Sequence, residues 1–158
     1  MSIKAIDHVA ITVPDIEQAT AFFSRAFGAR IVLEGLSLGD EPCAGEGAEL
    51  AFGMPRGGRI VARRVLNMGG HANVELFQFE GMEHQRPPHT YDYGIQHFAV
   101  QTDNLQKTAA DFLRAGGRLY QSEEFAHAVL EGMGPAQGWL YGETPWGSVI
   151  EMVTFREA

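Results

Sequence analysis

The sequence has little of what secreted, membrane-spanning or nucleic-acid-binding proteins require. It contains a single cysteine, Cys43, so it cannot form an internal disulfide. No apolar run approaches the length needed to cross a bilayer, and the first residues, Met-Ser-Ile-Lys, lack the apolar core of a signal peptide. The 12 basic residues are outnumbered by 20 acidic ones, for a formal net charge of −8. Because nucleic acids and anionic membranes bind basic surfaces, we expect neither as a partner and predict a cytoplasmic protein.

What remains is the composition of an ordinary globular protein. Hydrophobic residues make up 45% and charged residues 20% of the 158 positions, which predicts one domain with a core of useful size. Four of the basic residues fall close together in the chain: Arg56, Arg59, Arg63 and Arg64. This cluster is either a solvated strand with its turn or a place that holds an anionic substrate group.

The most informative feature is an internal repeat. The segment 6–16, IDHVAITVPDI, has nearly the same pattern as the segment 95–105, IQHFAVQTDNL. A constant offset pairs Ile6 with Ile95, His8 with His97, Ala10 with Ala99, Ile16 with Leu105, Phe23 with Phe112 and Gly28 with Gly117. A second similarity lies near the end of each copy, where VELF at 74–77 matches IEMV at 150–153. The chain therefore consists of two related modules, each running from a histidine to a glutamate.

Each module is predicted to fold as βαβββ. Alternating apolar residues predict strands, and an apolar stripe at helical spacing, preceded by the cap residue Asp15 and ended by Gly28, predicts a helix. The expected elements of module one (about 1–80) are strands 5–13, 30–36, 59–67 and 72–79, a helix 16–27 and a short helix near 48–52. After an irregular, proline-containing linker (about 81–93), those of module two (about 94–158) are strands 95–101, 118–121, 138–143 and 148–155 and a helix 104–115.

The alternation of the strands places four polar residues on one face. Val9 and Ile11 should pack on the helix, so His8 faces the other way, and His97 does so by the same reasoning. In the predicted strands 72–79 and 148–155, the apolar residues on either side of each glutamate should face the helix. Glu75 and Glu151 should therefore point to the opposite face of the strands. Two carboxylates among apolar neighbours would be costly without a cation. We therefore predict one divalent metal per site, Zn, Ni or Co first and Fe or Mn as alternatives, bound by His8, Glu75, His97 and Glu151.

These residues resemble the vicinal oxygen chelate superfamily, which includes glyoxalase I, methylmalonyl-CoA epimerase, extradiol dioxygenases and the fosfomycin and bleomycin resistance proteins. The resemblance covers nearly the whole chain, and its most specific stretches are IDHVAI, NVELF, IQHFAV and PWGSVIEMV. It implies an α+β fold of residues 1–158 as a single domain. In that fold two tandem βαβββ modules form an open, barrel-like sheet around a metal site, and we expect a homodimer because open sheet edges tend to pair.

The candidate ligand set separates the branches of this superfamily. His8, Glu75, His97 and Glu151 match the His/Glu/His/Glu set of bacterial glyoxalase I, whereas epimerases usually have Gln at the position of Glu75. The resemblance implies a metal-dependent lyase or isomerase that moves a proton at the carbon next to metal-chelated vicinal oxygens of a small oxo or hydroxy substrate. Glu151 is the first candidate for the catalytic base and Glu75 the second. An extradiol-type ring-cleaving dioxygenase and a non-catalytic small-molecule-binding resistance protein are the alternatives.

The walls of the pocket are expected from the same alternation, and aromatic side chains dominate the candidates. Most of these residues would serve equally well in a core. The candidates are Thr12, Phe77, Phe79, Gln101, Trp139, Tyr141, Trp146 and Phe155. Three histidines in segments predicted to be irregular, His84, His89 and His127, are possible outer acid-base groups.

Overall fold

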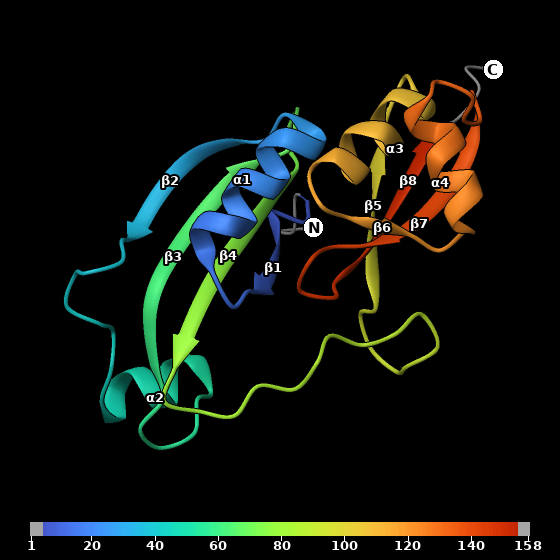
Figure 1. Cartoon of the computed structure of the whole chain (residues 1–158). Coiled ribbons are helices and arrows are strands. Elements are labelled where there is room, and N and C mark those ends of the chain that lie inside the picture. Colours follow the sequence, from blue (N-terminus) through green and yellow to red (C-terminus); the bar gives the residue numbers. More distant parts are fainter. Residues whose placement is uncertain (1–4, 155–158) are drawn as a thin grey trace. The chain divides into compact units, whose positions relative to one another are not determined.

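Two open four-stranded sheets organise the computed structural model, which describes residues 5–154 (Figure 1). The first half of the chain contains β1 (His8–Thr12), α1 (Ile16–Phe27), β2 (Arg30–Leu36), α2 (Glu46–Phe52), β3 (Arg59–Asn67) and β4 (Asn73–Glu80). The second half contains β5 (His97–Gln101), α3 (Leu105–Arg114), β6 (Arg118–Leu119), α4 (Glu123–Leu130), β7 (Gly138–Glu143) and β8 (Val149–Thr154).

The two sheets have the same topology. Their strand orders are β1-β4-β3-β2 and β5-β8-β7-β6. In each sheet the first strand of the module runs parallel to the last, and the remaining pairs are antiparallel. This confirms the predicted α+β class with two βαβββ modules, and the sheets do not close into a barrel.

Several element boundaries coincide with the predicted ones. The ranges 16–27, 30–36, 59–67 and 138–143 are those of α1, β2, β3 and β7, and the linker 81–93 contains no helix or strand. The N-terminus of α1 follows the predicted capping chemistry, because Asp15 Oδ1 accepts hydrogen bonds from the backbone N–H groups of Glu17 and Gln18, both at 2.9 Å. Gly28, with φ 70°, ends the helix in the left-handed conformation that favours glycine.

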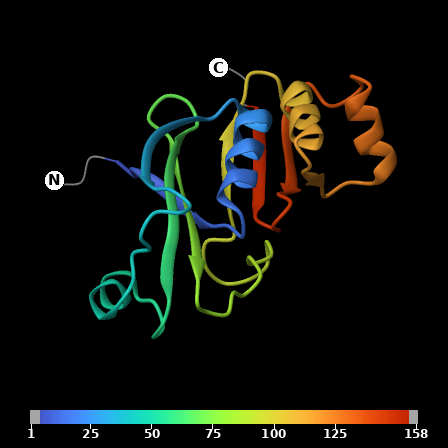
Figure 2. The same cartoon turned by 60° about the vertical axis from the view of Figure 1, so that its left-hand side comes forward.

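One helix was not predicted. Residues 123–130 form α4, so His127 lies on a helix and not in an irregular segment as expected. The signal for this helix was present in the sequence: Ser122 caps it by accepting a hydrogen bond from Phe125 N at 3.2 Å, and Glu123 and Glu124 follow in the first turn. Figure 2 shows α4 beside α3, away from the strands of its own sheet.

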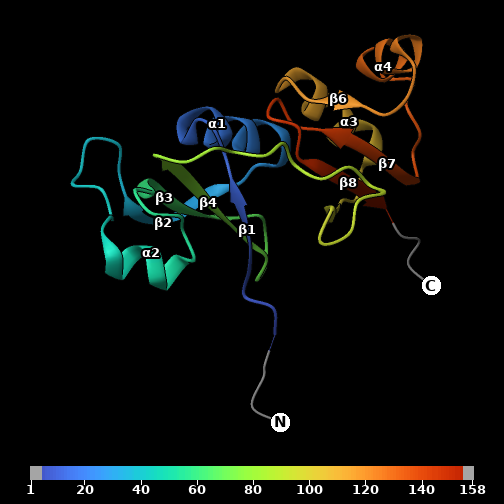
Figure 3. The same ribbon diagram turned by 90° about the horizontal axis from the view of Figure 1, so that it is seen from below.

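The first turns of α1 are attached to the first sheet by buried polar contacts. Arg64, on β3, is 6% exposed and donates through Nη2 to Glu17 Oε1 at 2.7 Å and through Nη1 to Thr20 Oγ1 at 2.7 Å. Its Nε donates to Glu34 Oε2 on β2, also at 2.7 Å. In Figure 3, α1 and α2 lie on opposite sides of this sheet. One face of the sheet is therefore committed to α1, and the other carries the residues discussed below.

The contacts divide the described chain into two compact units, one formed by residues 5–21 and 28–84 and the other by residues 22–27 and 85–154. The last turns of α1 therefore belong to the second unit. There the ring of Phe22 meets the rings of Phe112 and Trp146 edge-on, with centroids 5.3 Å and 5.4 Å apart. These aromatic contacts form part of the core of the second unit.

No helix in the described part of the chain is long and apolar enough to span a membrane.

Candidate active site

The first half of the candidate site is formed by β1 and β4. The parallel register pairs His8 with Asn73 and Ala10 with Glu75, so His8 and Glu75 are diagonal neighbours on one face. His8 Nε2 lies 3.1 Å from Glu75 Oε2. The other ring nitrogen, Nδ1, lies 2.9 Å from the carboxylate of Asp7. Asp7 therefore orients the ring and leaves Nε2 directed at Glu75.

The second half repeats this geometry on β5 and β8. The register pairs His97 with Val149 and Ala99 with Glu151, which gives the same diagonal relationship. His97 Nε2 lies 3.3 Å from Glu151 Oε2, and His97 Nδ1 is hydrogen-bonded to Gln96 Oε1. Asp7 and Gln96 were not singled out from the sequence. The signal was available, because each directly precedes its histidine at equivalent positions of the repeat.

The predicted assignment of strand faces is confirmed. The residues flanking the two glutamates are almost fully buried on the opposite face: Val74 at 2%, and Leu76, Ile150 and Met152 at 0% exposure. The histidines and glutamates thus share the face that is not packed on the helices.

The donor geometry of each half suits a divalent metal. Two ligands bonded at ~2.1 Å and separated by 90–109° at the metal lie roughly 3.0–3.4 Å apart. The distances of 3.1 Å and 3.3 Å between Nε2 and Oε2 fall within this range. Among residues 5–154, no group of three or more His, Cys, Asp or Glu side chains lies close enough together to hold a metal, so each half supplies one pair of donors. Catalytic zinc sites usually have three protein ligands, which is more than either pair supplies by itself.

The two glutamates differ in their surroundings. The side chain of Glu75 is 6% exposed and has both oxygens engaged, Oε2 with His8 and Oε1 with Arg63 Nε at 2.6 Å. That of Glu151 is 19% exposed and lies 3.3 Å from His97, and the residue paired with Glu151 on β7 is Tyr141. Burial, followed by the charge and hydrogen bond of Glu151, raises the pKa of Tyr141 above its ordinary value. Glu151 is therefore the less tightly held of the two carboxylates.

The clustered arginines have separate roles. Arg64 is the buried residue that attaches α1, and Arg59 pairs with Glu80 at 2.7 Å. Arg63, one position before Arg64, lies on the opposite face of β3 beside Glu75. Only Arg63 of these three therefore contacts a candidate site residue.

The aromatic candidates also divide into two groups. Trp139 and Tyr141 lie on β7 beside the second pair, and the Tyr141 ring meets that of His97 edge-on at 5.1 Å. Phe77 and Phe79 stack at 5.5 Å on the face of β4 that carries Glu75. Trp146, in contrast, packs on Phe22 in the core. Phe155 lies outside the described residues.

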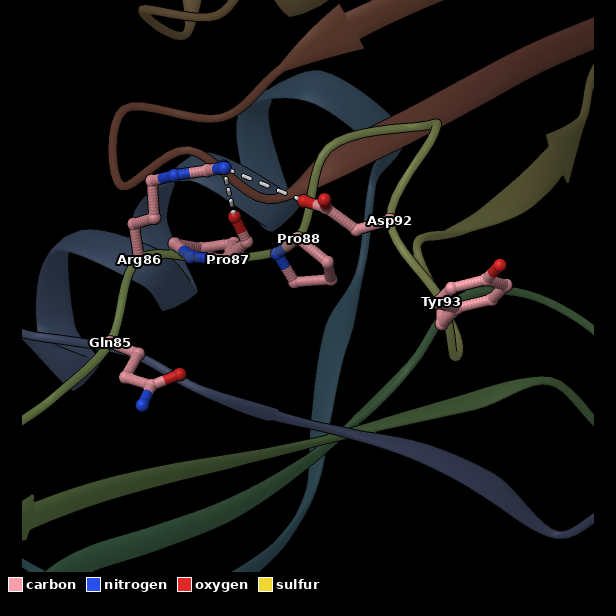
Figure 4. Close-up of a pocket in the computed structure, with 6 residues that line it drawn as sticks. All are labelled: Gln85, Arg86, Pro87, Pro88, Asp92 and Tyr93. Carbon is pink, nitrogen blue, oxygen red and sulfur yellow. Dashed lines mark hydrogen bonds and ion pairs between the residues drawn. The ribbon is translucent and has the colours of Figure 1, made fainter.

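The linker forms a pocket of its own, shown in Figure 4, with a volume of about 400 Å³. Asp92 closes the loop there: it accepts a hydrogen bond from the backbone N–H of His89 at 2.7 Å and pairs with Arg86 at 3.5 Å. Both contacts of the Asp92 carboxylate are therefore made within the linker itself. The lining residues are Gln85, Arg86, Pro87, Pro88, Asp92 and Tyr93, which include none of the four candidate ligands.

The two tandem βαβββ modules, each presenting a histidine and a glutamate on one strand face, define the class of fold. Residues 5–151 match the model of the glyoxalase/bleomycin resistance protein/dioxygenase superfamily, and the chain belongs to this family. Members of the family generally use a divalent metal.

Three proteins with similar sequences or structures indicate the kind of protein to which the chain is related. A 2-epi-5-epi-valiolone epimerase from Actinomyces sp. is 30% identical over 154 residues, which cover 94% of this chain and 78% of that protein. The crystal structure of a glyoxalase family protein from Bacillus cereus has a TM-score of 0.69 at 16% identity, covering 97% of this chain and 96% of that one. The trypanothione-dependent glyoxalase I of Leishmania major has a TM-score of 0.58 at 15% identity, covering 96% and 87%. The structural matches establish the fold, and the epimerase supports enzymatic activity of the isomerase, epimerase or glyoxalase kind.

Proposed function

We propose that the protein is a metal-dependent isomerase, of the epimerase or glyoxalase I type, that moves a proton at the carbon next to a carbonyl group. Its substrate is a small oxo or hydroxy compound with oxygen atoms on neighbouring carbons. The observation that carries the proposal is the pair of equivalent His–Glu contacts, at 3.1 Å and 3.3 Å, whose separations suit two donors of one metal. The 30% identical epimerase supports the reaction type, because epimerisation inverts one carbon centre.

The four candidate ligands have to act together in this proposal. His8, Glu75, His97 and Glu151 are the proposed ligands of one divalent metal. The family match over residues 5–151, which spans both modules, supports this view. When bound, a divalent metal supplies Lewis acidity at a carbonyl oxygen, which makes the neighbouring C–H group more acidic.

The residues of the chain supply orientation and proton transfer. Asp7 and Gln96 hold the two imidazoles by Nδ1 and keep Nε2 available as a donor. Glu151 is the proposed base, because it is more exposed than Glu75 and, among the described residues, pairs with no arginine. Glu75, held by His8 and Arg63, keeps its geometry and acts as a ligand.

The two alternatives from the sequence predict different behaviour. A ring-cleaving dioxygenase consumes oxygen and needs a position on the metal that the fourth ligand, Glu75, would occupy. A non-catalytic binding protein needs no complete ligand set. Two equivalent His–Glu pairs therefore favour a proton-transferring enzyme over a dioxygenase or a non-catalytic binding protein.

The decisive experiment follows deuterium incorporation. Metal-loaded protein is incubated in deuterated water under nitrogen with 2-epi-5-epi-valiolone, hemithioacetals, acyl-CoA esters and small oxo acids, and the recovered compounds are analysed by mass spectrometry. We expect one deuterium at the carbon next to the carbonyl in at least one compound class, at a rate that oxygen does not change. A strict oxygen requirement with ring-opened product would replace the proposal with the dioxygenase.

A further inference from the structure

Arg63 is placed to bind a ligand on the face of the first sheet that carries His8 and Glu75. Its Nε donates to Glu75 Oε1 at 2.6 Å, and its guanidinium carbon lies 5.8 Å from the centre of the Phe77 ring. Its side chain is 40% exposed. Among residues 5–154, the hydrogen bonds of Arg63 involve Nε alone, so Nη1 and Nη2 remain available as donors.

The surroundings of Arg63 restrict where the guanidinium lies. Gly35, on the neighbouring strand β2, has no side chain, and a Cβ at this position would lie 3.2 Å from Arg63 Nη1. The Phe77 ring packs on the other side and itself stacks on Phe79. A guanidinium held between a glycine and an aromatic ring, with one bond to a buried carboxylate, loses little further freedom when it binds a ligand.

The neighbouring arginines do not have this arrangement. Arg64 is buried, and its donors are used by Glu17, Thr20 and Glu34. Arg59 pairs with its own carboxylate, Glu80. Among residues 5–154 Arg63 pairs with one carboxylate, that of Glu75, which also contacts His8 and would bind the metal if the proposed site forms. The positive charge at Arg63 is thus only partly compensated.

We propose that Arg63 determines substrate specificity by binding an oxyanion, a carboxylate or a phosphate, on the substrate. This inference rests on the proposed function, because Arg63 and the proposed metal would contact the same carboxylate, that of Glu75. The two unpaired Nη donors form the planar fork that suits carboxylate and phosphate oxygens.

The test measures anion binding directly. Acetate and inorganic phosphate, with acetamide as the neutral control, are titrated by calorimetry and NMR into cobalt-loaded and metal-free protein. The variants are Arg63→Met, Arg63→Lys and the matched control Arg59→Met, which removes an exposed arginine from the same strand. Metal content and thermal unfolding are measured for each variant.

We expect Arg63→Met to weaken binding of the preferred oxyanion at least tenfold when it is compared with the wild type at equal cobalt occupancy. Arg59→Met should bind within twofold of the wild type, and Arg63→Lys should recover part of the affinity. Tighter binding of acetate would assign a carboxylic acid substrate, and tighter binding of phosphate a phosphorylated one. Oxyanion binding by Arg63→Met equal to that of the wild type, or no binding by the wild type, would overturn the inference.

Two further outcomes separate this inference from the proposed function. If Arg63→Met loses cobalt together with the anion, then Arg63 serves only to hold Glu75, and the inference is wrong. If the wild-type protein binds no cobalt but binds the oxyanion through Arg63, the inference stands and the metal-dependent reaction does not.

Discussion

His8 and Glu75 meet at 3.1 Å although neither is the other's register partner, since His8 pairs with Asn73 and Glu75 with Ala10. His97 and Glu151 have the same diagonal relationship in the second module. A slip of one residue in either register would move the glutamate to the face packed on the helix. The candidate ligand pairs therefore depend on strand register more than on any local loop.

Metal content should depend on both modules. Wild-type protein is expected to bind about one divalent metal per chain, and His8→Ala or Glu151→Ala should lose most of it, because each substitution removes one of four donors. Elemental analysis after dialysis measures this. His127→Ala, on the exposed face of α4, is the control and should keep its metal. Unchanged metal in both ligand variants would contradict the assignment.

The proposed base should be separable from metal binding. Glu151→Gln retains an amide oxygen that can coordinate, so it should keep much of its metal but lose turnover by about a hundredfold or more, the scale of general-base catalysis. Steady-state kinetics and metal analysis on the same sample test this. Glu131→Gln, at the residue that follows α4, should behave as the wild type. Turnover in Glu151→Gln within threefold of the wild type would move the role to another residue.

The contact between Glu17 and Arg64 should make the free energy of unfolding depend on pH under acidic conditions. The hydrogen bond from Arg64, opposed by burial, lowers the pKa of Glu17 below 4.5. A carboxyl group whose pKa is lowered on folding contributes its stability above the unfolded value of about 4.5 and loses it as the pH falls through the lower folded value. The contribution is a few tenths to about 1 kcal/mol, because Glu17 is largely exposed.

Urea unfolding at pH 7 and at about pH 3 measures this dependence. Glu17→Gln should be less stable than the wild type at pH 7, and the difference should shrink toward zero in acid. Glu41→Gln, in the loop between β2 and α2, serves as the control and should show no such trend. A difference for Glu17→Gln that is the same at both pH values would argue against the ion pair as its source.

Gly117 should be required for packing rather than for backbone freedom. A Cβ at this position would lie 2.2 Å from the Phe112 ring, which is fully buried. Gly117→Ala should therefore destabilise the fold by about 1–3 kcal/mol, the usual cost of overpacking. Gly47→Ala, in α2 with nothing within 4 Å, should instead stabilise by up to about 1 kcal/mol. Thermal unfolding of both variants tests the contrast.

Self-association should involve the edge strand β2. Ile31, Val32 and Leu33 are 48%, 59% and 48% exposed there, and an apolar edge strand is a ready pairing surface. We expect light scattering at micromolar concentration to give the mass of a homodimer, and Val32→Lys to raise the monomer fraction. Leu130→Lys, on α4, is the matched control. A monomer mass for the wild type would contradict this prediction.

The sequence alone determined the repeat, most element boundaries and the strand face on which the histidine and glutamate of each module lie. These features are encoded locally: alternation with period two fixes which strand residues share a face, and a cap residue with a glycine fixes a helix. The equivalence of His8 with His97 needed only the constant offset between the two halves. Local signals of the same kind mark α4, where Ser122 caps the helix and Glu123 and Glu124 lie in its first turn.

The tertiary structure decided which strands are neighbours and in what register. The parallel pairing of β1 with β4 joins residues more than sixty positions apart, and no local pattern specifies such a contact. For the same reason the partners of the arginines followed only from the structure, where Arg64 is buried against Glu17 and Arg63 faces Glu75. Adjacent residues of one strand point to opposite faces, so a single step along the chain separates a structural arginine from one available to a ligand.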